Sequence, residues 1–161
     1  AAVALLALGL AMAGAIGCGE EEGVADGATV HAYVEAPVCS KAAMVAVVGN
    51  EDGEGIGVRF ICLTAVRGPE LSQGVGGGRQ IDLAIVGANA RRATEDSTTV
   101  AYLQADDPAV NRFTEPILEE AGIGTITAPK GKAQSQLLKL VGEADPSSLR
   151  ADVREALEEE S

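Results

Sequence analysis

The clearest candidates for chemistry are two adjacent carboxylates, Asp106 and Asp107, which follow a short apolar run at 100–103. If that run is a strand, the pair lies where open α/β sheets bind their ligands, just outside the carboxyl end of a strand. A structural interpretation competes with this one: Asp106 is then a loop acid, and Asp107 caps the helix that starts at Pro108. The pair therefore marks either a binding site or a helix start.

Nothing else in the sequence completes a catalytic or metal centre. His31, the single histidine, alternates with apolar neighbours in an expected strand and is predicted to be structural. No serine has a nucleophile-elbow pattern, no CxxC spacing indicates a metal site, and the glycine-rich stretch at 74–78 matches no phosphate-binding loop. Lys130 and Lys132 are expected to be solvated loop charges. We therefore expect a protein that is not an enzyme and that has no cofactor or metal.

Two of the three cysteines, Cys39 and Cys62, are expected on neighbouring elements of the fold. Cys39 lies just past the first expected strand, and Cys62 lies within the second. In an exported protein such a pair can be oxidised, so a disulfide between them is one prediction. Two buried, reduced thiols are the alternative, and the sequence does not choose between them.

The charge balance excludes several classes of partner. The formal net charge is −12, and there is no tryptophan and little other aromatic content. An acidic chain without a basic patch is poorly suited to nucleic acid or to anionic lipid surfaces. The shortage of aromatic rings also argues against a stacking site for sugars or bases.

Apolar periodicity predicts strands that alternate with helices, which favours a parallel sheet with helices on both faces. We expect a three-layer α/β sandwich whose doubly wound parallel sheet has four to five strands. Expected strands lie at 29–34, 58–64, 100–103 and 123–127, and expected helices lie at 41–48, around 83–95, at 107–121, after 132 and after 146.

The two central helices have apolar stripes that should face the sheet. Polar Asn89 is expected on the outward side of the first, and Gly122 supplies the stop of the second. The stripes are Leu83, Val86, Ala90 and Ala93 in one helix and Val110, Phe113, Ile117 and Ala121 in the other.

Three segments carry a resemblance to a known family. They are 88–93 (ANARRA), 100–102 (VAY) and 115–123 (EPILEEAGI). In the last, Pro116 lies inside a helical pattern although proline removes a helix hydrogen bond. Together they resemble the N-terminal lobe of type I periplasmic binding proteins, specifically the branched-chain amino acid (leucine-binding type) receptors of ABC importers. The resemblance covers roughly 29–140.

The resemblance implies an amino-acid-like ligand held by loops after the first, third and fourth strands, which by position are 37–40, 104–107 and 127–130. The family usually has small hydroxyl residues after the third strand, whereas this chain has Gln-Ala-Asp-Asp there. Only Thr127 supplies a hydroxyl after the fourth. The ligand-binding residues that the resemblance implies are Ser40, Gln104, Asp106, Asp107, Thr127 and Ala128, with Thr127 and Asp106 foremost.

The first 17 residues carry no charge and fit the apolar core of an export signal better than a membrane-spanning helix. Residues 16–18 (IGC) resemble a bacterial lipobox, in which Cys18 becomes the lipid-modified first residue of the mature chain. An ordinary signal peptide in which Cys18 is incidental is the alternative. We expect an exported protein that is lipid-anchored to the outer face of the cytoplasmic membrane.

The expected organisation is a signal peptide at 1–17, a tether at 18–28, a periplasmic-binding-protein-like lobe at 29–145 and a C-terminal helix at 146–161. Receptors of this family close two lobes over the ligand, and this chain has the length of one. One hypothesis is a solute-binding lipoprotein that serves an ABC permease, with a second copy of the chain supplying the missing wall. The other is a non-transport envelope lipoprotein that uses a degenerate lobe as an interaction or sensory scaffold. An incomplete gene is a third interpretation, and a flavodoxin- or receiver-like domain is an alternative fold.

Overall fold

The computed structural model of the chain describes residues 27–41, 44–49, 55–67, 80–129 and 131–159. The expected signal peptide, the lipidation site Cys18, most of the expected tether and Lys130 lie outside the described residues. Among the residues that are described, no helix is both long and apolar enough to cross a membrane.

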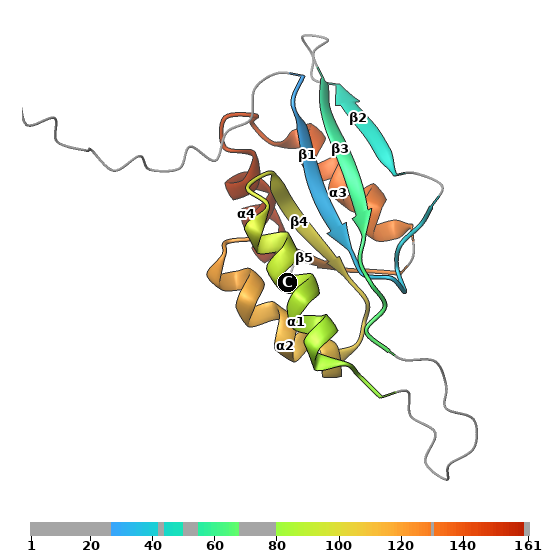
Figure 1. Cartoon of the computed structure of the whole chain (residues 1–161). Helices are drawn as coiled ribbons and strands as arrows, with labels where there is room; N and C mark the ends of the chain where they lie inside the picture. Colours follow the sequence, from blue (N-terminus) through green and yellow to red (C-terminus); the bar gives the residue numbers. More distant parts are fainter. Residues whose placement is uncertain (1–26, 42–43, 50–54, 68–79, 130, 160–161) are drawn as a thin grey trace, which may run out of the picture.

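One five-stranded sheet forms the centre of the fold (Figure 1). Its strands are β1 (Thr29–Val34), β2 (Val45–Gly49), β3 (Gly55–Cys62), β4 (Thr99–Gln104) and β5 (Gly124–Thr127). They lie in the order β2-β3-β1-β4-β5. All neighbouring pairs are parallel except β2 with β3, which is antiparallel. The prediction of an α/β fold with a mostly parallel sheet is confirmed.

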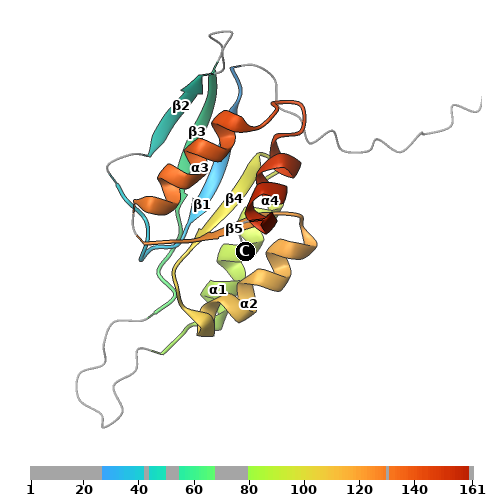
Figure 2. The ribbon, with the colours of Figure 1, turned by 180° about the vertical axis from the view of Figure 1, so that it is seen from behind.

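Four helices flank the sheet, two on each face (Figure 2). They are α1 (Leu83–Glu95), α2 (Pro108–Glu120), α3 (Lys132–Glu143) and α4 (Leu149–Glu159). Asp82 caps α1 and Asp107 caps α2, because each carboxylate accepts hydrogen bonds from free backbone N–H groups of the first turn. Gly122 ends α2 with a φ of 68°, a conformation that glycine adopts without steric cost, as predicted.

The helix predicted at 41–48 is wrong, because residues 45–49 form strand β2. Val45 and Val47 point to one face of the sheet, and Ala46 and Val48 point to the other, so exposure alternates along the segment. A short run of apolar residues fits either a buried helix or a strand, and the β-branched valines favour the strand once β3 offers hydrogen-bonding partners. The sheet therefore has β2 as an additional strand, which lies at its edge and is antiparallel to β3.

The buried face of α2 is also rotated from its predicted position. Phe113, predicted to face the sheet, is 38% exposed, whereas Leu118 is completely buried. Asn111 and Thr114 take the buried positions because their side chains hydrogen-bond to the backbone, at Ala105 O and Asn111 O respectively. In α1, Asn89 is likewise buried, contrary to prediction, and donates to the carbonyl of Thr64 over 2.8 Å.

Two apolar cores lie on the two faces of the sheet. The larger one joins β1, β3 and β4 to α3 and α4 and contains Phe60, Leu137 and Val153. The smaller one joins the sheet to α1 and α2 and contains Tyr33, Tyr102 and Leu118. On their sheet-facing sides, α3 buries Leu137, Leu140 and Val141, and α4 buries Leu149, Val153 and Leu157. The sheet is thereby held rigid, with its carboxyl edge free to carry side chains.

Candidate functional site

The candidate site lies at the carboxyl edge of the sheet, between β1 and β4. The chain leaves β1 towards β2 and β3 on one side, and leaves β4 towards β5 on the other. Such a reversal of strand order opens a crevice between the two loops, and open α/β sheets bind ligands there. Here the first residues after the two strands, Glu35 and Ala105, contact one another.

Glu35 is a buried acid at the centre of this edge. Its side chain is 4% exposed, and it accepts hydrogen bonds from the Ala105 N–H over 2.9 Å and from the Tyr102 hydroxyl over 3.4 Å. No lysine or arginine in the described segments forms an ion pair with it. Burial raises the pKa of Glu35 above its ordinary value, and the nearby charge of Asp107 adds to this, while the two hydrogen bonds partly offset it.

Asp107 and Arg67 form an ion pair beside Glu35. The Arg67 guanidinium donates two hydrogen bonds to Asp107 Oδ2, one of them from Nε over 3.2 Å. Asp107 also accepts from the Ala109 N–H and so caps α2. Burial alone would raise the pKa of Asp107, but the hydrogen bonds and charge of Arg67 outweigh it and hold that pKa below its ordinary value. The crevice thus contains a charged acid next to a buried one.

Two amide side chains extend the polar network around Ala105. The Gln104 amide donates to Thr127 Oγ1 and to Glu115 Oε1, both over 2.9 Å. The Asn111 amide donates to the Ala105 carbonyl over 3.1 Å. The oxygens of both amides, Gln104 Oε1 and Asn111 Oδ1, are buried and accept no hydrogen bond. Because an unpaired buried acceptor is unfavourable, this edge has capacity for donors.

The structure gathers only some of the predicted ligand contacts at this edge. Gln104, Asp107 and Thr127 belong to the network, as the preceding contacts show. Asp106 is exposed, and its side chain makes no contact with the network. Ser40 and Ala128 are half-buried, and Ala128 packs against the larger core. As ligand contacts, all six residues remain predictions.

Glu35, Arg67 and Asn111 are among the residues of the network that the sequence-based prediction lacks. Glu35 had a recognisable signal, since a charged residue directly after the apolar residues that end a central strand, Ala32 to Val34, is costly to bury unless it has a role. Arg67 and Asn111 had none, because their partners lie 40 and 6 residues away and only the fold brings them together.

The cysteine pair supports the loop that carries Glu35. The structure joins Cys39 and Cys62 by a disulfide with 5.8 Å between their Cα atoms, a usual separation for this bond. The N–H groups of Val38 and Cys39 both donate to the Glu35 carbonyl, over 3.1 and 3.0 Å. The turn after β1 is therefore fixed to the end of β3.

A groove of about 450 Å³ lies elsewhere, at the amino end of β5 between α2 and α4. Its lining includes Glu119, Gly124, Arg154 and Leu157. It contains no predicted ligand contact and lies at the opposite edge of the sheet from Glu35. We assign the candidate site by the polar network rather than by this groove, because the four charged residues of the groove, Glu115, Glu119, Arg154 and Glu158, are all exposed.

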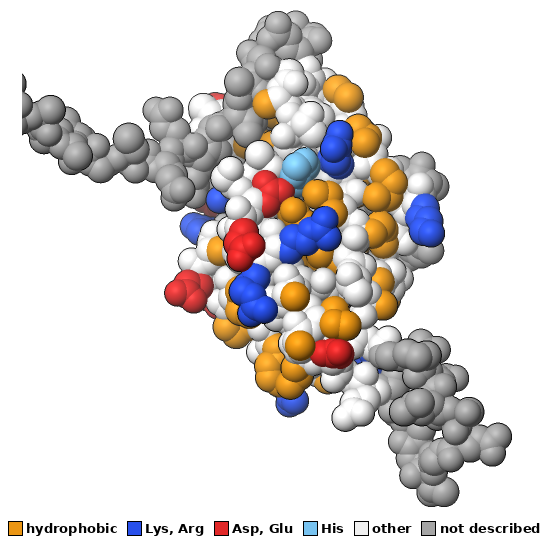
Figure 3. Space-filling view, viewed as in Figure 1, with side chains coloured by type: hydrophobic (Ala, Val, Ile, Leu, Met, Phe, Trp, Pro, Cys, Tyr) orange, Lys and Arg blue, Asp and Glu red, His pale blue; other side chains and the backbone are white. Residues whose placement is uncertain are grey.

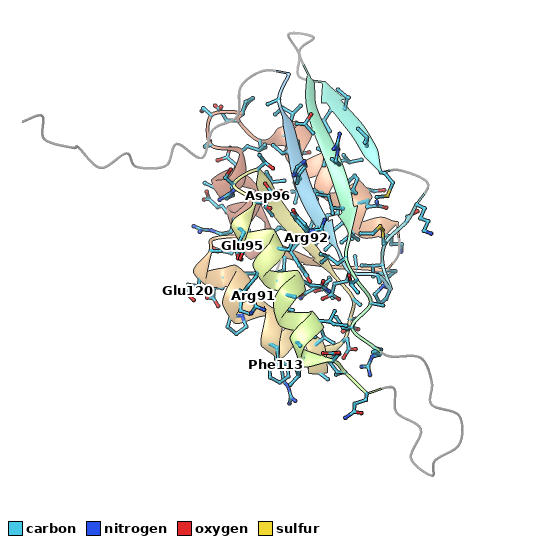
Figure 4. The ribbon with its side chains drawn as sticks, viewed as in Figure 1. Arg91, Arg92, Glu95, Asp96, Phe113 and Glu120 are labelled. Carbon is cyan, nitrogen blue, oxygen red and sulfur yellow. A yellow bond between two sulfur atoms is a disulfide. The ribbon has the colours of Figure 1, made fainter. Side chains whose placement is uncertain are left out.

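A second polar cluster surrounds Asp96 at the amino edge of the sheet (Figure 4). Its carboxylate contacts His31 Nδ1 at 2.6 Å and accepts hydrogen bonds from the Tyr33 hydroxyl, from Thr98 Oγ1 and from the Thr98 N–H. Burial opposes ionisation of Asp96, but these hydrogen bonds outweigh it and hold the pKa below its ordinary value. His31 is thus a half-buried structural residue that ties β1 to the end of α1.

Replacing Asp96 by Asn is expected to lower the free energy of unfolding at pH 7 by about 1 kcal/mol, since it weakens several hydrogen bonds in a solvent-screened site. A lowered pKa in the folded state stabilises the protein fully above the unfolded pKa of about 3.9, and this contribution decreases below that value and is lost only as the pH falls through the lower folded pKa. Urea unfolding at pH 7 and pH 3 should therefore show a smaller difference at pH 3 than at pH 7. An equal difference at both pH values would contradict this assignment.

In comparisons with family models, with curated proteins and with solved structures, no significant match to this chain is found. The described residues also contain no cluster of histidine, cysteine or acidic side chains suited to a metal ion.

Proposed function

We propose that the chain is a solute-binding lobe of the type I periplasmic-binding-protein kind, which takes an amino-acid-like ligand at the carboxyl edge of its sheet. The observation that carries this proposal is the network around Ala105. It places a buried acid, Glu35, and the unpaired oxygens of Gln104 and Asn111 at the point where the strand order reverses. The proposal includes export and a lipid anchor on Cys18.

The chemistry of the network favours a ligand that carries an ammonium group. Glu35 and the two amide oxygens are acceptors, and an ammonium group has three donors and no acceptor. Arg67 is a cation beside this network, and it is paired with Asp107. A ligand carboxylate that replaces Asp107 would accept the same two guanidinium donors of Arg67, so one amino acid satisfies both ends of the site.

A single lobe encloses little of such a ligand, because good sites bury most of the ligand surface. The proposal therefore includes a second wall, provided by another copy of the chain or by the permease that the ligand is delivered to. If another copy of the chain provides this wall, adding the ligand should increase the molecular mass measured by sedimentation, while an unliganded sample stays monomeric.

Thermal unfolding of the purified protein with a panel of amino acids and small carboxylates tests the proposal. We expect one class of ligand to raise the melting temperature with rising concentration, since a ligand at about 100 times its dissociation constant adds about 2.7 kcal/mol. Thr127→Ala should reduce this effect, because it removes a hydrogen bond that orients Gln104. Thr125→Ala is the matched control, on the same strand but at its amino end. A panel without any response, or equal loss in both variants, would contradict the proposal.

A second candidate function is an envelope scaffold that binds a protein rather than a solute. It is favoured by one observation, the large exposed valines of β2, Val45 and Val47, which are 59% and 73% exposed. Apolar side chains gathered on one face of a soluble domain mark an interaction surface more often than a ligand pocket. The panel of ligands distinguishes the two functions, because no ligand of the panel should change the melting temperature of a scaffold.

A further inference from the structure

Among the helices of the described segments, none covers one half of a sheet face. We call it the open sheet face and define it by Val45, Val47, Arg59, Ile61 and His31. The strand register places Val45 beside Arg59 and Arg59 beside His31, so these side chains form one row across β2, β3 and β1. His31 contacts Asp96 at the end of α1, which shows that the row lies on the same face as α1 and α2.

The helix layer on this face is incomplete. Figure 1 shows α1 and α2 over β4 and β5, while β2 and β3 have no helix in front of them. On the opposite face, α3 contacts β2, β4 and β5, and α4 contacts β4 and β5. In an α/β sandwich a sheet buries its apolar faces against helices, so the two exposed valines of β2 are unusual. Figure 3 shows apolar side chains over this part of the molecule.

The open sheet face combines an exposed positive charge with its apolar side chains. Arg59 is exposed at its centre, and its side chain forms no ion pair or hydrogen bond within the described part of the chain. Arg92 lies at its border with its guanidinium 5.8 Å from the centre of the Tyr33 ring. Figure 3 shows Lys or Arg side chains and the single histidine next to apolar side chains on this side of the molecule.

The dimensions of the face fit one helix. Two strands occupy about 10 Å across the sheet, which is close to the usual spacing between packed helices. The eight residues of β3 extend about 26 Å, the length of a helix of about 17 residues.

We propose that the open sheet face is a docking surface for an amphipathic helix of a partner protein, whose apolar stripe covers Val45 and Val47 and whose carboxylates face Arg59. The partner helix covers the half of this sheet face that α1 and α2 leave open. A second copy of the chain is a poorer occupant, because two copies related by symmetry would bring their Arg59 side chains to the same interface. This surface is separate from the edge that carries Glu35 and does not depend on the solute-binding proposal.

The probe is a fluorescein-labelled peptide of 16 residues that forms an amphipathic helix, with a leucine stripe and glutamates beside it. A matched peptide has lysine in place of each glutamate. Titration of the full-length protein into each peptide, followed by fluorescence anisotropy, should show binding of the glutamate peptide and at least tenfold weaker binding of the lysine peptide.

Three variants locate the binding surface. Arg59→Glu and Val47→Lys should each weaken binding of the glutamate peptide at least tenfold. Arg59→Glu should also strengthen binding of the lysine peptide. Both side chains are exposed, so the melting temperature should stay within a few degrees of the wild type. The control is Arg91→Glu, which makes the same charge change at an exposed site on α1 outside this face (Figure 4).

Each other outcome overturns the proposal. Equal affinity for both peptides would mean that the contact is apolar and non-specific. If Arg91→Glu weakens binding of the glutamate peptide as much as Arg59→Glu does, the peptide is attracted by the charge of the whole molecule and not by this face. If neither peptide binds and sedimentation shows a dimer that Val47→Lys dissociates, the open sheet face is an interface between copies of this chain. If neither peptide binds and the protein is monomeric, the face has no helical partner of this chemistry.

Discussion

Replacing Glu35 by Gln is expected to raise the melting temperature at pH 8 and to reduce the stabilisation by ligand. Burial raises the pKa of Glu35 in the folded state, so ionising it there is more costly than in the unfolded chain. The amide of Gln has nearly the same shape, can still accept from the Ala105 N–H, and carries no charge that needs a partner. The wild-type Glu35 therefore reduces stability, but it provides the negative charge that a cationic ligand would need.

The pH dependence of this effect follows from the direction of the pKa shift. For an acid with a raised folded pKa, stability is greatest below the unfolded pKa of about 4.3 and decreases as the pH rises towards the folded pKa. Gln has no such dependence. Urea unfolding between pH 4 and pH 9 should show nearly equal stability at pH 4 and a growing advantage of Glu35→Gln at higher pH. The difference between the two proteins isolates Glu35 from Asp96 and Asp107, which titrate in both.

Loss of the Glu35 charge should weaken the ligand more than loss of Thr127. A hydrogen bond to a charged group contributes about 1.5–3 kcal/mol, so we expect the dissociation constant to rise roughly 10- to 100-fold. Glu119→Gln is the matched control, since Glu119 is exposed on α2. If Glu35→Gln is less stable than the wild type at pH 8 and still responds to the ligand, Glu35 is a structural acid and the proposed ammonium site is wrong.

The order of most elements could be predicted from the sequence because each has a local signal. Asp107 followed by Pro108 fixed the start of α2, Gly122 fixed its end, and Pro116 is tolerated inside it, as the resemblance suggested. The region of β2 had no such signal. Its residues are short, apolar and uncapped, and only pairing with β3 makes them a strand rather than a helix.

The candidate site was only partly predictable for a related reason. Asp107 was found because it serves two purposes, as a cap within its own helix and as a partner of Arg67 in space. The buried faces of the helices were misplaced where polar residues take apolar positions. Asn111 and Asn89 can do so because a backbone carbonyl from another segment receives each amide, and no periodicity in the sequence reports such a partner.

Reduction of the disulfide between Cys39 and Cys62 is expected to lower the free energy of unfolding by about 3 kcal/mol. The two cysteines are 23 residues apart, and opening a loop of this size restores conformational entropy to the unfolded chain. For a domain of this size the melting temperature should fall by roughly 10 °C. Circular dichroism melts with and without a phosphine reductant measure the shift directly.

The double variant Cys39→Ala/Cys62→Ala is the control, because its melting temperature should be low and should not respond to the reductant. If the wild type does not respond either, while free-thiol titration finds both thiols in the folded protein, the cysteines are reduced and the alternative prediction holds.

Reduction should also affect the site, because the turn after β1 is joined to β3 through Cys39 and carries the carbonyl of Glu35 that Val38 and Cys39 bind. When this turn is released, Glu35 has more access to water and its pKa should move back towards its ordinary value. Ligand affinity should then fall on reduction even at temperatures where the protein stays folded, which links the oxidation state of the cysteines to the occupancy of the site.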